Sequence, residues 1–204
     1  MDALLEYQTI TAPSQAEFKR SNSRFVSFAF PVSKRQAVQA HLASLKQRFP
    51  DATHHCSAFR LLEGGKPIEH SNDDREPLNS AGPPILQVLA GRALLNVLLV
   101  VVRYYGGTKL GIGGLIRAYG DAAKAALDAA TIVTRIPQTT LRIRYPHAMT
   151  GAVMAVLHRN RVRIDGVDYE TCPQARITVP LAQREGVTRQ LQEACAGQAE
   201  VLDD

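Results

Sequence analysis

The sequence predicts an α+β protein built from two domains, and two observations carry this prediction. Apolar residues recur with period two in some segments and at helical spacing in others along the 204 residues. After Pro137 the pattern changes to a self-contained βαββαβ order, which is typical of the ferredoxin-like fold. We therefore expect a first domain over residues 1–133 and a second over residues 138–204, with residues 131–138 as the linker.

The first elements along the chain are predicted to be strands and a helix. Residues 4–10 and 24–32 are expected to be strands, the second because Phe and Val alternate there with small or polar residues. Ser33 is expected to cap a helix that continues to Pro50, since apolar residues recur there at helical spacing. A short strand is expected over residues 56–62.

The middle of the chain combines a polar segment with the most apolar one. Glu63–Gly82 is predicted to be a loop, and loops this long are usually functional or disordered. Pro83 and Pro84 are expected to open a short helix that ends near Gly91. Residues 94–102 are almost continuously apolar, as in a strand covered on both faces. A helix follows over about residues 113–130, and its buried face is expected to comprise Leu115, Ile116, Tyr119, Ala122, Ala123, Ala126 and Leu127.

The tail alternates strands and helices. Strands are expected at 140–145, 161–171, 175–181 and 199–202, and helices at 148–160 and 184–196. Alternation directs these side chains to the core: Leu141, Ile143, Val162, Ile164, Ile177 and Val179. The open sheet face then carries Arg142, Arg144, Arg161, Arg163 and Arg176, with Asp168 and Glu170. RNA contact, cross-strand ion pairs and docking against the first domain all remain compatible with this face.

Composition limits the classes of function. The formal net charge of +5 lies entirely in residues 1–137, which carry 16 basic and 11 acidic residues. A positive excess of this size fits weak attraction to nucleic acid. Three cysteines without C-x-x-C spacing argue against a disulfide framework or a zinc ribbon. The longest apolar stretch is about half the ~20 residues of a membrane helix, and no secretory signal is visible. We therefore expect a cytoplasmic protein without membrane contact. We also expect no cofactor.

The most informative segment runs from Arg103 to Tyr119, because six of the 14 glycines lie between positions 106 and 120. A glycine loop before a helix brings backbone N–H groups close to an anion. It is not a Walker A loop, since Ile112 and Gly113 stand where Lys and Ser or Thr belong. A tight strand-to-helix turn is the structural alternative, and Asp121 four residues after Arg117 suggests a solvated ion pair there. The candidate anion- or nucleic-acid-binding residues are Arg103, Tyr104, Tyr105, Gly106, Gly107, Lys109, Gly111, Gly113, Gly114 and Arg117.

An acidic run, Asp73-Asp74-Arg75-Glu76-Pro77, forms the second candidate site. Adjacent carboxylates together with substrate phosphates are typical Mg²⁺ ligands. The structural alternative is a polar turn in which the Asp side chains accept hydrogen bonds from nearby backbone N–H groups.

The third candidate is the cluster of His54, His55, Cys56 and His70. In a strand, His54 and Cys56 share one face, which is short of the four ligands of a zinc site. The same pair has no readable third group to orient it as a catalytic dyad. A packed strand is the favoured interpretation, and no metal is expected.

Three sets of residues together resemble the signature of the YigZ/IMPACT family. They are Ala52-Thr53-His54-His55-Cys56, the acidic run followed by Ala81-Gly82-Pro83, and Arg103-Tyr104-Tyr105-Gly106-Gly107 with its continuation to Tyr119. The resemblance covers roughly residues 20–130, and the tail is similar to the smaller second domain of the bacterial YigZ branch. It marks His54, Cys56, Asp73, Asp74, Glu76 and Pro77 as motif residues. Arg75 departs from the family pattern, which usually has Gly there, and Asn79-Ser80 replace Gly-Thr.

The resemblance also implies a fold and a function. The fold is the left-handed βαβ type shared with the GHMP kinases and the fourth domain of elongation factor G. The eukaryotic IMPACT proteins are translational regulators that act through a partner protein. We therefore expect a non-catalytic binding protein that contacts RNA, the ribosome or a translation-related partner. The alternative is a metal-assisted enzyme acting on a phosphorylated or nucleotide substrate at the glycine loop, although no complete catalytic constellation is readable.

Overall fold

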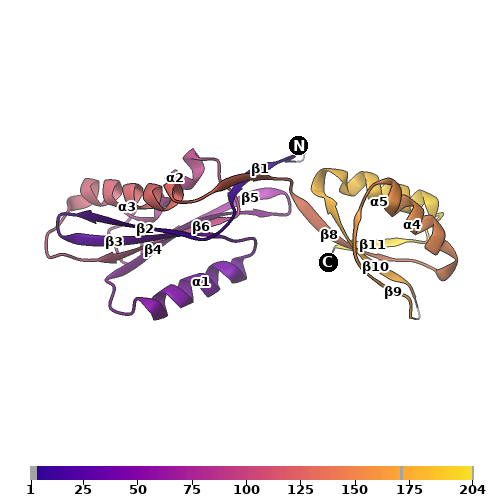
Figure 1. Ribbon diagram of the computed structural model, residues 1–204, viewed down its shortest axis with the longest axis horizontal. Coiled ribbons are helices and arrows are strands. Elements are labelled where there is room, and N and C mark those ends of the chain that lie inside the picture. The colour runs from indigo at the N-terminus through magenta and orange to yellow at the C-terminus, as the bar shows by residue number, and fades with distance from the viewer. Residues whose placement is uncertain (1–3, 171, 204) are drawn as a thin grey trace. The chain divides into compact units, whose positions relative to one another are not determined.

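A computed structural model describes residues 4–170 and 172–203 (Figure 1). The chain divides into two compact units, one over residues 7–135 and the other over residues from 136 onward with residues 4–6. The first unit contains β1 (Tyr7–Ile10), β2 (Ser14–Arg20), β3 (Ser23–Pro31), α1 (Arg35–Arg48), β4 (His54–Glu63), β5 (Lys66–Asn72), α2 (Gly82–Gly91), β6 (Val97–Tyr104), α3 (Gly111–Asp128) and β7 (Ile132–Arg135). The second contains β8 (Gln138–Arg144), α4 (Thr150–Arg159), β9 (Arg163–Asp168), β10 (Gln174–Pro180), α5 (Arg184–Ala194) and β11 (Glu200–Asp203), with short 3₁₀ turns at His147–Met149 and Leu181–Gln183.

The first unit is a three-layer structure around one five-stranded sheet. The strand order is β2-β3-β6-β4-β5, and every neighbouring pair is antiparallel. Helices α2 and α3 cover one face and α1 covers the other (Figure 1). The central strand β6 is buried on both faces, and residues 97–102 are 0% exposed. This confirms the expectation from its continuously apolar sequence.

The topology of this sheet requires a left-handed crossover. Strand β3 is connected through α1 to the parallel strand β4, and β5 is connected through α2 to the parallel strand β6. In each case one antiparallel strand lies between the connected pair. When the sheet is viewed from one face and each connected pair is turned so that its strands point up, both connections run to the same side. However, α1 and α2 lie on opposite faces of the sheet. The two crossovers therefore have opposite hands, and one departs from the usual right-handed rule.

The second unit has the predicted ferredoxin-like fold. Its antiparallel sheet has the order β11-β8-β10-β9. Helices α4 and α5 pack on one face and enclose a single core. Leu141, Ile143, Ile177 and Val179 are 0% exposed, and Val162 and Ile164 pack at the edge of the same core. The end of the predicted strand at Thr171 lies outside the described residues.

Two strands of the five-stranded sheet were not predicted, because edge strands carry a weak apolar signal. The expected loop Glu63–Gly82 contains β5, which follows a turn at Gly64 and Gly65 and pairs along β4. Only the part from residue 73 to residue 81 is a loop. Strand β2 lies at the other edge of the sheet and was also missed. A strand is recognised from alternating apolar and polar residues only when one of its faces is fully buried. These polar edge strands are buried only in part, so their sequences lack that alternation.

Three smaller expectations were wrong. Residues 131–138 are not a free linker, since β7 pairs with β1 and belongs to the first unit. Lys34, not Ser33, occupies the N-cap of α1, and no side chain caps that helix. Ile116 is 39% exposed, whereas Ala118, which was not predicted, is buried in the same stripe of α3 as Tyr119.

Candidate functional site

The three sequence motifs meet at one end of the five-stranded sheet. Antiparallel pairing of β4 with β6 places His54 directly opposite Arg103. The acidic turn after β5 returns to the start of β4, where Asp74 Oδ2 accepts a hydrogen bond from the backbone N–H of His55 at 2.7 Å. The glycine loop leads from the end of β6 into α3. Sheet register, not proximity in sequence, therefore assembles the site.

A buried network links these motifs. Arg103 Nη1 donates to Glu76 Oε1 at 2.5 Å, and the same oxygen accepts from the Tyr119 hydroxyl at 2.6 Å. Arg103 Nη2 donates to Ser23 Oγ at 3.2 Å, and Arg103 itself is only 4% exposed. Its guanidinium lies between two aromatic rings, those of Phe25 at 5.5 Å and Tyr105 at 5.4 Å. Arg103 thus holds the site together from within and is not available as a surface contact for phosphate.

The acidic turn is held by its own carboxylates. Asp73 Oδ1 accepts hydrogen bonds from the backbone N–H groups of Ala81 and Gly82, both at 2.8 Å, and so caps α2. Its second oxygen accepts from the N–H of Asn79 at 2.9 Å. Together with the Asp74 contact, this is the capping arrangement expected of a polar turn. Within the part of the chain that the structure describes, no cluster of three or more His, Cys, Asp or Glu residues is arranged to hold a metal ion.

The departures from the family pattern occupy left-handed backbone. Arg75 has φ +69° and Asn79 has φ +63°. These are conformations that glycine adopts without penalty, and other residues adopt them at a cost of roughly 1–2 kcal/mol. Arg75 therefore has a backbone conformation that glycine adopts readily.

The side chains of the histidine and cysteine cluster make separate contacts with their neighbours. His54 Nδ1 lies 2.8 Å from the carbonyl oxygen of Asp74, which makes this nitrogen the donor. Cys56 Sγ donates to the carbonyl of Asp73 at 3.0 Å and contacts the Tyr119 hydroxyl at 3.4 Å. His70 packs against Phe59 further along the sheet, with tilted rings whose centroids are 5.5 Å apart.

Ionisation of this cluster follows from its burial. Burial raises the pKa of the Cys56 thiol well above its usual range, with the nearby carboxylates adding to the effect. Cys56 is therefore a protonated core residue and a poor nucleophile. Burial also lowers the pKa of His55, which lies on the opposite face of β4, although the Asp74 carboxylate partly opposes this.

The glycines of the loop serve different purposes. A Cβ at Gly106 would lie 2.1 Å from the backbone of Asn22, so only glycine fits there. Gly107 and Gly111 have φ +83° and +69°, which a side chain would strain. A Cβ at Gly113 would make only an ordinary contact with Arg117 Nη1 at 3.8 Å, and a Cβ at Gly114 would meet Leu110 at 3.1 Å. The tight-turn interpretation therefore explains part of the loop, and the exposed start of α3 remains for binding.

The start of α3 opens onto a cavity of about 450 Å³. No described side chain accepts a hydrogen bond from the first N–H groups of this helix. The cavity is lined by Thr53, His54, Glu76, Pro77, Arg103, Tyr105, Lys109, Leu110, Gly111, Ile112 and Leu115. Sequence analysis missed Pro77 and Leu115 as cavity walls and the Glu76–Arg103 pair, because residues so far apart in sequence give no pairing signal.

The remaining candidate residues differ in availability. Tyr104 is already engaged by neighbouring side chains, since its hydroxyl donates a hydrogen bond to Asp51 at 3.1 Å and its ring lies under the guanidinium of Arg24. Lys109 is exposed and makes no ion pair with any described residue. The expected pair of Arg117 with Asp121 does not form, because Asp121 is engaged by Arg20 at 3.3 Å and Lys124 at 3.8 Å.

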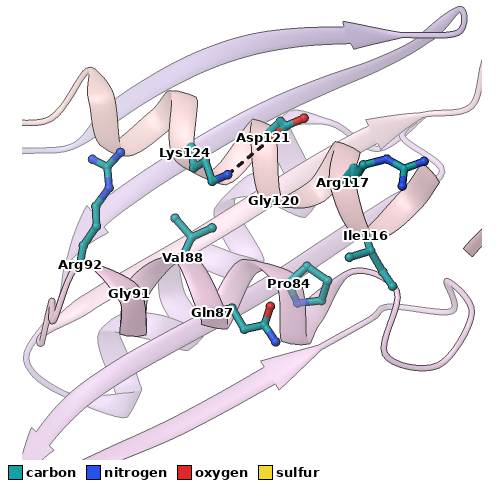
Figure 2. A pocket seen from close by; sticks show the side chains of 10 residues that line it. All are labelled: Pro84, Gln87, Val88, Gly91, Arg92, Ile116, Arg117, Gly120, Asp121 and Lys124. Carbon is teal, nitrogen blue, oxygen red and sulfur yellow. Dashed lines mark ion pairs between the residues drawn. The ribbon is translucent and has the colours of Figure 1, made fainter. Parts of the chain in front are cut away.

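A second hollow, of about 480 Å³, lies on the outside of the first unit between α2 and α3 (Figure 2). Its floor is formed by small and apolar residues such as Val88 and Gly120, and Ile116 stands at one end. Two of its cations are paired, Arg92 with Asp128 and Lys124 with Asp121. It contains no buried polar group, so it has less capacity for specific recognition than the cavity at α3.

The open face of the second sheet carries mixed charge. Arg163 pairs with Asp165 at 2.7 Å, and Asp165 also accepts from Thr178 at 2.6 Å. Arg161 has φ +51° in the turn before β9 and does not belong to the sheet face, contrary to the strict alternation. The ion pair lies within β9, and the contact between strands is the hydrogen bond from Thr178 in β10, so these polar contacts account for part of this surface.

Fold and site together define a class of protein: an α+β chain whose N-terminal unit combines a split, partly left-handed βαβ sheet with a cavity at the start of a helix that no side chain caps. Residues 21–127 match the model of the Impact N-terminal domain. The chain is 33% identical over 94% of its length to the IMPACT family member YigZ of Escherichia coli, 94% of which is covered, and 34% identical over 81% to YvyE of Bacillus subtilis, with 76% covered. The chain belongs to the IMPACT family.

A solved structure supports the complete fold. A crystal structure described as a hypothetical protein superimposes with a TM-score of 0.71 at 27% identity and covers 98% of both chains. No helix among the described residues is long and apolar enough to cross a membrane.

Proposed function

We propose that this protein is a non-catalytic binding protein whose N-terminal unit contacts RNA of the translation machinery through the start of α3. The observation that carries the proposal is the uncapped N-terminus of α3 beside exposed Lys109 and Tyr105. Open N–H groups and the positive end of the helix attract phosphate. An exposed tyrosine ring provides a surface on which a base can stack.

Charge supports the same choice. Residues 7–135 carry 16 basic and 9 acidic residues, a net charge of +7. Lys109 and Arg117 are exposed near the beginning of α3 and form no ion pair among the described residues. We therefore assign the phosphate contacts to these two side chains. Arg103 was expected to contact phosphate directly, and its guanidinium donates a hydrogen bond to Glu76 of the acidic turn.

Binding is favoured over catalysis because the candidate catalytic groups are engaged elsewhere. The Asp73 and Asp74 carboxylates accept backbone hydrogen bonds, and the raised pKa of Cys56 keeps its thiol protonated. A metal-assisted enzyme would need carboxylates directed at a common point. The family resemblance supplies the link to translation, and a protein partner is the other outcome of the experiment below.

The test is the salt dependence of binding to a single-stranded RNA oligonucleotide and to ribosomes, measured with the full chain. We expect the double variant Lys109→Ala/Arg117→Ala to bind more weakly and to reduce the slope of log affinity against log salt by about 1.4, since each lost phosphate contact contributes ~0.7. The matched control is Lys34→Ala/Lys66→Ala, which removes the same charge at two exposed positions away from α3.

The two variants separate local contact from general attraction. Equal affinity and slope in both would refute the assignment to α3. Undiminished ribosome binding by the α3 variant, together with no binding to RNA, would indicate a protein partner instead.

A further inference from the structure

The cavity at the start of α3 has the walls of a small-molecule site. Its volume of about 450 Å³ lies within the range of ligand pockets. Pro77, Leu110, Ile112 and Leu115 provide apolar surface, and the ring of Tyr105 provides a flat one. Such a lining accepts a planar, largely apolar body.

The inner part of the cavity contains polar groups without complete hydrogen bonding. Glu76 is 8% exposed, and only its Oε1 accepts hydrogen bonds from described residues. Its Oε2 is left as an acceptor. Arg103 is 4% exposed, and its Nε has no hydrogen-bond partner. His54 Nε2 is 3.6 Å from Glu76 Oε1, beyond hydrogen-bond distance. An acceptor left unpaired in a largely buried site is costly, so a ligand that donates a hydrogen bond to Glu76 Oε2 gains affinity and specificity.

The rim of the cavity accepts an anion. Gly111 begins an 18-residue helix without a side-chain cap, and Lys109 stands beside it. A planar body with N–H donors, joined at a short distance to an anion, describes a nucleotide. The base would enter between the apolar wall and Tyr105, and the phosphate would remain at the helix start.

We propose that this cavity holds one unpaired nucleotide of a single-stranded RNA, which rests on the RNA-binding function proposed above. The base stacks on Tyr105, and its exocyclic amino group donates to Glu76 Oε2. The phosphate accepts hydrogen bonds from the first N–H groups of α3 and pairs with Lys109. Duplex RNA is excluded from this mode, because base pairing occupies the edge that Glu76 would contact.

The test uses AMP, UMP, adenosine and inorganic phosphate as probes, titrated into the full chain and followed by amide chemical shifts. We expect AMP to bind more tightly than adenosine or phosphate alone, and more tightly than UMP, which lacks an amino group. The shifts should lie around residues 105–115. Wild-type protein that shows no saturable AMP binding would overturn the inference.

Two matched variants distinguish the cavity from the rest of α3. Ile112 lines the cavity and is 60% exposed, whereas Ile116, one turn later and 39% exposed, lines the α2–α3 hollow (Figure 2). Ile112→Trp fills the mouth of the cavity, and we expect it to weaken AMP about tenfold or more, as loss of a stacked base does. Ile116→Trp should change AMP affinity less than about twofold. Equal losses in the two variants would contradict the proposal.

The inference and the proposed function fail separately. RNA binding that depends on Lys109 and Arg117 but is unchanged in Ile112→Trp refutes the cavity and leaves the function standing. AMP binding abolished by Ile112→Trp in a protein that binds no RNA supports the cavity as a site for a free nucleotide and refutes the RNA-binding role.

Discussion

The buried ion pair of Arg103 with Glu76 is expected to determine much of the stability of the N-terminal unit. The two side chains are 5% and 4% exposed, and Nη1 and Oε1 are 2.5 Å apart. Glu76→Ala leaves the guanidinium charged in an interior site and removes the acceptor of the Tyr119 hydroxyl. Removing one partner of a buried ion pair costs about 3–5 kcal/mol, and we expect the free energy of unfolding to fall by that amount.

Calorimetry and urea unfolding followed by circular dichroism would measure this loss. For a unit of this size it corresponds to a fall of roughly 10–20 °C in the midpoint. Amide NMR spectra at intermediate urea would assign the early transition to residues 7–135. The control is Asp128→Ala, which breaks the surface pair with Arg92 and should cost less than about 1 kcal/mol.

A second variant tests the physical reason. Glu76→Leu combined with Arg103→Met removes both charges, so it should recover much of the stability lost in Glu76→Ala. The reasoning is refuted if Glu76→Ala is as stable as Asp128→Ala, because the pair would then contribute no more than a solvated one.

The other predictions concern packing, reactivity and domain structure. Gly106→Ala should lower the unfolding midpoint sharply, since its Cβ would lie 2.1 Å from neighbouring backbone. Gly120→Ala should instead stabilise α3 by about 0.5–1 kcal/mol, because a Cβ there would meet no atom within 4 Å. Iodoacetamide at pH 8 should label exposed Cys172 and leave Cys56 unmodified, because burial raises the pKa of Cys56 and its reactive thiolate forms only at far higher pH. Mass spectrometry measures the labelling, and modification of Cys56 without modification of Cys172 would contradict this expectation. Limited proteolysis should cut near Ile136, which is 59% exposed, and yield two folded fragments; a single resistant fragment would contradict the two-domain organisation.

Elements with a strong apolar period were predictable from sequence. The buried strand β6, the long helix α3 and the complete βαββαβ order of the second unit all appear where their patterns indicated. Each is identified by side chains whose burial depends on their own local spacing. The edge strands β2 and β5 escaped detection, because half-exposed polar strands lack that spacing.

The motif residues were also recognisable from sequence, but their roles were not. The glycine loop and the acidic turn were identified, yet Arg103 was expected to contact an anion or nucleic acid. Its partner is Glu76, which is 27 residues away in sequence. Only the pairing of β4 with β6 and the fold of the turn onto β4 decide which side chains meet.

The sequence by itself thus determined the two α+β units, their cores and the family motifs. Only the tertiary structure decided at which positions a neighbouring segment leaves room for glycine alone. It also decided which carboxylates accept hydrogen bonds from backbone N–H groups and where a cavity lies. The physical reason is the range of the forces involved. Helix and strand formation follow from neighbours along the chain, whereas ion pairs and cavities arise between segments that only sheet register brings together.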